Sequence, residues 1–122
     1  MLHSVSWASC LPLVVFCGLL SFNPAAKADT VALMDIVQAQ CLSCHQIDRK
    51  RVGPPFREIA QRYAPGPTQE TRAYLQRQIQ QGSRGNWGAI PMPAQNRISA
   101  EQAQAIAAWL LSLANSSTKE NS

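Results

Sequence analysis

The sequence predicts an all-α fold of about four helices. Four segments place apolar residues three or four positions apart, which is the spacing that buries one face of a helix. Loops rich in proline and glycine separate these segments, and no segment alternates apolar and polar residues long enough to predict a strand. No internal repeat is visible. A chain of 122 residues has room for a single domain.

The first two predicted helices are short. Residues 31–40 form the first, and one of its faces carries Leu33, Ile36, Val37 and Gln40. Residues 56–63 form the second, which begins after Pro54-Pro55. The breakers Pro65-Gly66-Pro67 end it, because proline cannot continue a helix.

The last two predicted helices carry capping signals. Thr68 can cap a third helix that runs to residue 81, and Gly82 marks its end. Ser99 and Gln102 indicate a capping box at the start of the fourth. The continuous apolar face of this fourth helix consists of Ala103, Ile106, Ala107, Leu110 and Leu113.

Residues 1–28 are predicted to be a secretion signal. The segment has an apolar centre at 11–20 and ends in Ala26-Lys27-Ala28, the small-x-small pattern that signal peptidases accept. It lacks the usual basic start. A retained membrane anchor is one alternative, although a bilayer needs ~20 apolar residues, and lipid attachment at Cys10 or Cys17 is another. All three interpretations place the domain outside the cytoplasm, and we expect it in the periplasm.

Cleavage after Ala28 would leave a domain at 29–114 and a polar tail at 115–122. These 94 residues hold ten basic and seven acidic side chains, a net charge of +3. This positive charge is small and spread along the chain, which excludes a nucleic-acid-binding surface. It suits brief contact with acidic proteins. A domain this small gains from a large buried cofactor.

The sequence Cys41-Leu42-Ser43-Cys44-His45 is the C-x-x-C-H pattern of c-type haem attachment. Two thiols at this spacing can bond the two vinyl groups of a porphyrin, and the following histidine can bind the iron. A thioredoxin-like pair would need a preceding strand, and a zinc site would need a fourth ligand that the exported chain lacks. A simple disulfide stays open as a further alternative.

An electron carrier needs a second axial ligand for its iron, and methionine is the usual partner of histidine. His45 is the only histidine that remains after export, and Met34 lies on the helix that leads into the cysteines. Met92 is left, held between two prolines in a stiff extended loop. A lone methionine is more often core filler, but the haem motif favours ligation here.

Further motifs follow the haem pattern through the rest of the domain. They are Val52-Gly53-Pro54-Pro55-Phe56, Gly82-Ser83, Gly85-Asn86-Trp87-Gly88-Ala89-Ile90-Pro91-Met92-Pro93 and the last helix with Trp109. Together they resemble the class I cytochromes c, in particular the short bacterial monohaem c-551/c-552 type. The resemblance implies a class I cytochrome c fold whose first and last helices cross, with one covalently attached haem and its iron wedged against the Met92 loop.

The same resemblance implies roles for two more residues. The carbonyl of Pro54 would accept the second ring hydrogen of His45, and Trp87 would donate its indole N–H to a haem propionate, with loop packing as the alternative. Two positions depart from the family pattern. Gln95 stands where an asparagine is frequent, and Arg77 is one position from an arginine that assists a propionate in some members.

Iron held on both faces has no open site for a substrate, which favours an electron carrier over an enzyme. We expect a shuttle between a quinol-oxidising complex and a terminal oxidase or nitrite reductase, matured by haem-attachment machinery. A permanent haem subunit of a periplasmic dehydrogenase, for example a sulfite-oxidising one, is the alternative. A sensor or peroxidase from which Met92 dissociates is a third. A basic rim of Arg49, Lys50 and Arg51 could meet acidic partners, unless these charges are merely solvated.

Overall fold

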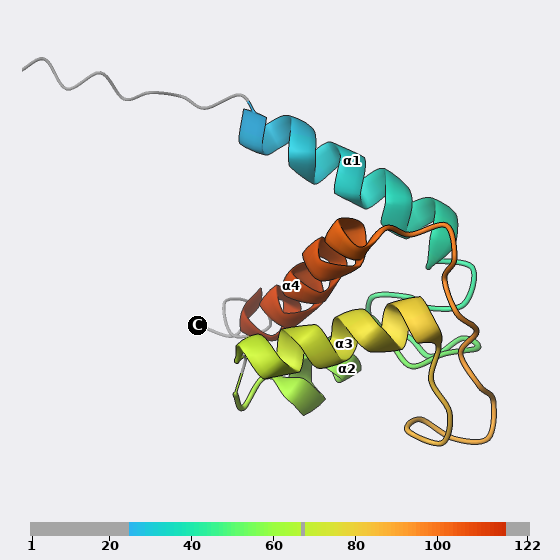
Figure 1. Cartoon of the computed structure of the whole chain (residues 1–122). Helices are drawn as coiled ribbons and strands as arrows, with labels where there is room; N and C mark the ends of the chain where they lie inside the picture. The colour runs from blue at the N-terminus through green and yellow to red at the C-terminus, as the bar shows by residue number, and fades with distance from the viewer. Residues whose placement is uncertain (1–24, 67, 117–122) are drawn as a thin grey trace, which may run out of the picture.

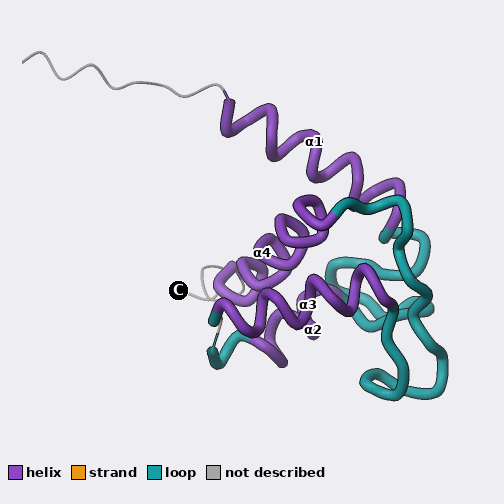
Figure 2. Tube along the Cα trace, viewed as in Figure 1, coloured by secondary structure: helices purple, strands orange, loops and turns teal. Residues whose placement is uncertain are grey.

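The computed structural model describes residues 25–66 and 68–116, with the backbone alone for 25–28. This part of the chain forms four helices: α1 (Ala25–Gln40), α2 (Phe56–Tyr63), α3 (Gln69–Gln81) and α4 (Ala100–Ser116). It contains no strand, and its extended backbone pairs only in an isolated antiparallel bridge between Ser83 and Met92. The all-α prediction is therefore confirmed (Figure 1, Figure 2).

The predicted secretion signal lies outside the described residues, except for the backbone of 25–28 in the first turn of α1. It stays a prediction. Within the described helices, none is long and apolar enough to cross a membrane.

Helix α4 is the centre of the core and packs against the other three helices. Figure 1 shows α1 lying across one side of α4, with α2 and α3 on the other. The buried apolar residues of the core are Val37, Phe56, Ile59, Leu75, Ile79, Ile98, Ala103, Ile106, Ala107, Leu110 and Leu111. Leu111 lies outside the predicted face of α4, so the buried stripe of this helix is wider than its spacing indicated.

Local signals fix the ends of α2 and α3 as predicted. Helix α2 has the expected bounds, after a proline whose ψ of 143° is extended. At the start of α3 the Thr68 hydroxyl accepts a hydrogen bond from the Thr71 amide at 3.2 Å. Gly82 then ends α3 with a positive φ of 80°, a conformation that favours glycine.

Two helix boundaries differ from the prediction. Helix α1 begins at Ala25 rather than at 31, because three of its first four residues are alanines, which have the highest helix propensity. Helix α4 continues to Ser116, beyond the expected domain end at 114. The guanidinium of Arg57 on α2 donates to the Leu113 carbonyl at 3.2 Å and to the Ser116 hydroxyl at 3.1 Å, and so stabilises this last turn.

The capping box of α4 leads to a first prediction. The Ser99 hydroxyl accepts from the Gln102 amide at 3.2 Å, and the Gln102 side chain accepts from the Ser99 amide at 2.9 Å. We expect Ser99→Ala to lower the free energy of unfolding by about 1 kcal/mol, measured by urea denaturation. Gln104→Ala, at an exposed position of the same helix, is the control and should leave it nearly unchanged.

The same substitution should alter the pH dependence of stability. Hydrogen bonds from its own backbone amide and from Ser99 lower the pKa of Glu101. A carboxyl whose pKa is depressed by folding stabilises the fold above its unfolded pKa and loses this effect as pH falls through the folded value. The difference in stability between wild type and Ser99→Ala should therefore shrink in acid, and a difference that grows in acid would contradict the assignment.

Candidate functional site

The chain leaves α1 in a tight turn that carries Cys41, Cys44 and His45. The Cys41 amide donates to the Val37 carbonyl at 2.9 Å, and the His45 amide donates to the Cys41 carbonyl at 2.9 Å. This continued turn places both thiols and the imidazole along one cavity. Both cysteines are free thiols and half-buried. Burial raises the pKa of the Cys41 thiol, and the nearby charge of Cys44 raises it further.

The imidazole of His45 has a defined tautomer. Its Nδ1 lies 2.7 Å from the carbonyl oxygen of Pro54, and because a carbonyl can only accept, Nδ1 must be the protonated nitrogen of the neutral ring. The lone pair of Nε2 is then available to a metal. The side chain is only 7% exposed, and its ring stacks on Phe56 with centroids 5.0 Å apart and planes 12° apart.

The loop after the cysteines wraps closely around this ring. The Gly53 amide donates to the Cys44 carbonyl at 2.8 Å, and the Phe56 amide donates to the Gln46 carbonyl at 2.8 Å. A Cβ atom added to Gly53 would lie 2.8 Å from Nδ1 of His45 and closer still to its Cε1. No side chain therefore fits at Gly53 while the imidazole keeps its position.

Met92 reaches the same cavity from the loop between α3 and α4. Its amide donates to the Ser83 carbonyl at 2.9 Å, and the Ser83 amide donates to the Met92 carbonyl at 3.0 Å. This reciprocal pair fixes the backbone of Met92 beside the end of α3. The neighbouring Pro91 and Pro93 stiffen the loop on both sides.

Gly82 leads to a second prediction about this loop. An added Cβ there would lie 2.5 Å from the Met92 carbonyl oxygen, whereas an added Cβ at Gly85 meets nothing within 4 Å. Both glycines have positive φ values, 80° and 73°, a conformation that side chains rarely adopt, so alanine is strained at either position. We expect Gly82→Ala alone to break the pairing with Ser83.

Amide hydrogen exchange of Ser83 and Met92 measures this effect. Gly82→Ala should accelerate the exchange of both amides, and Gly85→Ala is the control that shares the strain without the clash. Equal acceleration in the two variants would mean that the close approach to Met92 has no consequence.

Trp87 lies in the same loop and lines the cavity. The neighbouring Asn86 anchors the loop to α3, since its Nδ2 lies 3.1 Å from the Tyr74 hydroxyl, 3.3 Å from Gln78 Oε1 and 2.9 Å from the Ser83 hydroxyl. An amide nitrogen has two hydrogens for these three acceptors, so one hydrogen is shared. The hydroxyl pair of Tyr63 and Tyr74 adjoins this network, and burial raises the pKa of Tyr63.

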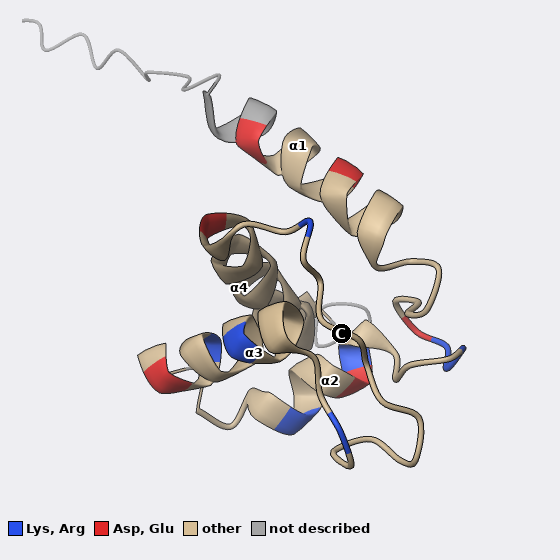
Figure 3. Cartoon of the chain, turned by 45° about the vertical axis from the view of Figure 1, so that its right-hand side comes forward, with Lys and Arg blue, Asp and Glu red and all other residues tan. Residues whose placement is uncertain are grey.

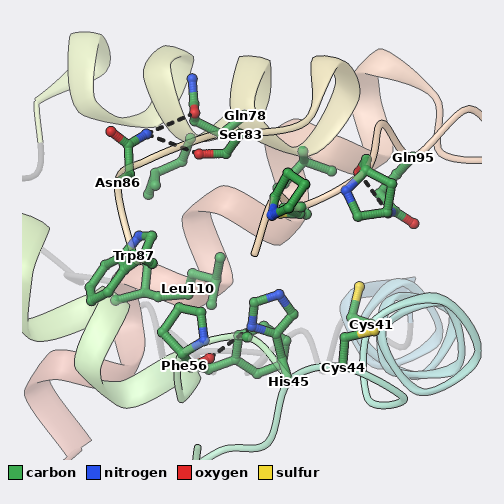
Figure 4. A pocket seen from close by; sticks show the side chains of 18 of the residues that line it. Cys41, Cys44, His45, Phe56, Gln78, Ser83, Asn86, Trp87, Gln95 and Leu110 are labelled. Atoms are coloured by element: carbon green, nitrogen blue, oxygen red, sulfur yellow. Dashed lines mark hydrogen bonds between the residues drawn. The ribbon is translucent and has the colours of Figure 1, made fainter. Parts of the chain in front are cut away.

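The cavity between these elements has two walls of different chemistry. Figure 4 shows Cys41, Cys44 and His45 on one side and Gln78, Ser83, Asn86 and Gln95 on the opposite side, with Trp87 at one end. Buried apolar side chains line its interior: Ile59, Leu75, Ile79, Ile106 and Leu110.

This donor set fits a haem. Two free thiols can bond its vinyl groups, an unprotonated imidazole nitrogen and a thioether sulfur are available to its iron, and the apolar lining suits its ring. The described residues contain no group of three or more His, Cys, Asp or Glu side chains that could bind a metal ion directly. All six residues predicted for the site, Cys41, Cys44, His45, Pro54, Trp87 and Met92, line this one cavity.

The two departures from the family pattern have different outcomes. Gln95 lines the cavity, but its amide donates to the Pro93 carbonyl at 3.0 Å and so braces the loop. Arg77 is exposed and does not line the cavity, where the next residue, Gln78, lies instead. Arg77 therefore lies outside the cavity, in keeping with its displacement by one position from the family pattern.

Charged side chains are spread over the surface. Figure 3 shows Lys and Arg on α2, α3 and the loops, interrupted by acidic residues. Arg49, Lys50 and Arg51 are all exposed in the loop after His45. Beside them Asp48 forms an ion pair with Arg57, so its carboxylate is balanced by a cation outside this basic rim.

Sequence reasoning assigned no site role to Arg62, Gln78 or Asn86. Arg62 contacts the Asn86 carbonyl and the Trp87 ring, and Gln78 contacts Asn86. These contacts join separate segments of the chain, so no local pattern signals them. In the sequence, only the presence of Asn86 and Trp87 in the loop between α3 and α4 indicated that side-chain contacts hold this loop in place.

Comparison with known proteins was consistent with this site. A family model for cytochrome c matches residues 34–114. The chain is 37% identical to cytochrome c-551 of Stutzerimonas stutzeri, over 84% of this chain and 94% of that protein. It is 42% identical to cytochrome c-552 of Nitrosomonas europaea, over 60% of this chain and 69% of that protein. The crystal structure of wild-type Nitrosomonas europaea cytochrome c552 superposes with a TM-score of 0.61 at 40% identity, covering 66% of this chain and 98% of that one.

Proposed function

Because this chain belongs to the cytochrome c family, whose members bind one covalently attached haem c with its iron, we propose that it carries single electrons in the periplasm. The observation that carries the proposal is the hydrogen bond from Nδ1 of His45 to the Pro54 carbonyl at 2.7 Å. It fixes the ring proton on the side away from the metal and orients the imidazole before any iron is bound. Figure 4 shows this ring projecting into the cavity beside both thiols.

Different residues of the cavity would bind different parts of the haem. Cys41 and Cys44 would supply the two thioether links, and His45 and Met92 would ligate the iron. Pro54 would orient His45, and Trp87 would donate its indole N–H to a propionate. When bound, the haem supplies a one-electron iron couple.

The protein sets the potential of that couple and keeps other reactions away. A thioether ligand and an apolar lining both favour the reduced iron. The pairing of Met92 with Ser83 and the burial of His45 fix both ligands, so little structure changes when an electron moves. With His45 and Met92 both bound to the iron, no coordination site would remain for a substrate, and the protein would act as a carrier rather than as an enzyme.

Its partners are redox proteins that contact the mouth of the cavity. Val52 and Ile90, which line it, are 48% and 67% exposed, and Arg49, Lys50 and Arg51 lie in the adjoining loop. An apolar rim with basic neighbours suits brief contact with acidic partners. A quinol-oxidising complex is the proposed donor, and a terminal oxidase or nitrite reductase is the proposed acceptor.

Expression of the full chain with haem-attachment machinery tests the proposal. Mass spectrometry should show the mass of one haem on the exported polypeptide and cleavage after Ala28. The single variants Cys41→Ser and Cys44→Ser should each keep only one thioether bond, and the double variant should carry no covalent haem. An exported wild-type protein without added haem mass would overturn the proposal.

A further inference from the structure

Arg62 on α2 contacts the Trp87 loop in two ways. The central carbon of its guanidinium lies 4.4 Å from the centroid of the Trp87 ring. Its Nη1 donates to the carbonyl of Asn86 at 2.8 Å. That carbonyl belongs to the peptide group that joins Asn86 to Trp87, so one planar guanidinium fixes both the indole plane and the backbone that carries it.

The contacts with Trp87 and with the Asn86 carbonyl are the main contacts of the Arg62 side chain. Although Arg62 is exposed, it forms no ion pair with a carboxylate in the described part of the chain. Its other aromatic contact is with the adjacent Tyr63, at 5.9 Å. A surface arginine that stacks on a cavity residue, rather than on an acidic neighbour, is placed to orient that residue.

The indole of Trp87 is prepared for a partner inside the cavity. Its face is covered by Arg62, and within the described residues no acceptor receives its N–H, the only polar group of the ring. Rotation of the indole would break the stacking on Arg62, so the ring keeps one orientation. The indole N–H is therefore held in a fixed place on a ring that lines the cavity.

We propose that Arg62 is a positioning residue that holds the indole N–H of Trp87 toward the haem propionate and thereby raises the reduction potential. The inference rests on the proposed function, since it needs a haem in the cavity. A hydrogen bond to the propionate reduces the negative charge that the oxidised iron would otherwise attract, and this favours the reduced state. Loss of Arg62 frees the indole, weakens that hydrogen bond and lowers the potential.

The test compares Arg62→Gln, Arg62→Lys, Trp87→Phe and the double variant Arg62→Gln/Trp87→Phe as haem-loaded protein. Arg72→Gln is the matched control, because Arg72 is also exposed and helical but, unlike Arg62, is not stacked on Trp87. Nitrogen NMR of the indole measures solvent exchange of the Trp87 N–H, and redox titration measures the midpoint potential. The absorption spectrum confirms in each sample that the haem is attached and axially ligated.

In Arg62→Gln the indole hydrogen of Trp87 should exchange with solvent about tenfold faster, a factor that corresponds to about 1.4 kcal/mol. The midpoint potential should fall by more than it does in Arg72→Gln. Arg62→Lys keeps the charge but not the planar stack, and should recover little of either effect. In the Trp87→Phe background, Arg62→Gln should change the potential no more than Arg72→Gln.

Three results would overturn the inference. They are unchanged indole exchange, full recovery by lysine, or the same loss of potential with and without Trp87. Each of these, seen in protein whose haem spectrum is intact, removes the role of Arg62 and leaves the proposed function standing. Absence of attached haem in wild type would instead remove the proposed function.

Discussion

Replacing Met92 with alanine is expected to convert the six-coordinate iron of the haem-loaded protein to a form with an open axial position. Alanine keeps the backbone pairing with Ser83 at 2.9 and 3.0 Å but removes the thioether sulfur. The weak far-red sulfur-to-iron band should vanish, and the reduced form should bind carbon monoxide. The midpoint potential should fall by well over ~59 mV, a tenfold change in a one-electron equilibrium, because a ligand that favours reduced iron is lost.

Met34→Ala is the matched control for this experiment. Met34 lies on α1 and is partly buried against the core, so its truncation should cost stability through lost packing. It should leave the far-red band, carbon monoxide binding and the potential unchanged. If Met34→Ala removes the band, or if Met92→Ala keeps it, the assignment of Met92 as axial ligand is wrong.

The sequence was informative wherever a few adjacent residues decide the structure. The bounds of α2 and α3 follow from prolines, the Thr68 cap and the Gly82 stop, and all act within one helical turn. The attachment motif is likewise local, since five consecutive residues place two thiols and an imidazole along one cavity. Met92 could be identified as a candidate cavity residue because the prolines on both sides prevent it from joining a helix.

Contacts between distant segments could not be predicted in this way. The anchor from Arg57 to the end of α4 joins residues 56 and 59 positions apart, and Arg62 meets Asn86 across 24 positions. The orientation of α3 also depends on its packing against α4, so the sequence alone did not reveal that Gln78 lies at the cavity and Arg77 does not. The start of α1 was missed because an alanine-rich stretch is both a good helix former and a typical end of a secretion signal.

Replacing Gly53 with alanine is expected to displace the imidazole of His45 and so to lower both stability and reduction potential. The added Cβ would lie 2.8 Å from Nδ1 and 2.9 Å from Nε2 of His45, so the imidazole must move. The ring cannot tilt freely, because Phe56 stacks on it at 5.0 Å and the Pro54 carbonyl holds Nδ1. The backbone is equally constrained, since the Gly53 amide is bonded to the Cys44 carbonyl.

Overpacking of this kind costs about 1–3 kcal/mol in the free energy of unfolding, measured by guanidinium denaturation. It should also move the imidazole off the iron axis, which lowers the potential and shifts the absorption spectrum of the haem-loaded protein. Gly66→Ala is the matched control, because the nearest atom to its added Cβ is a Thr68 methyl at 4.0 Å. There alanine should be neutral or stabilise by about 0.4–1 kcal/mol, by restricting the unfolded chain. A Gly53→Ala protein with wild-type stability and spectrum would show that the loop can retreat from the imidazole. The close fit of Gly53, Pro54 and His45 would then not be what orients the ligand.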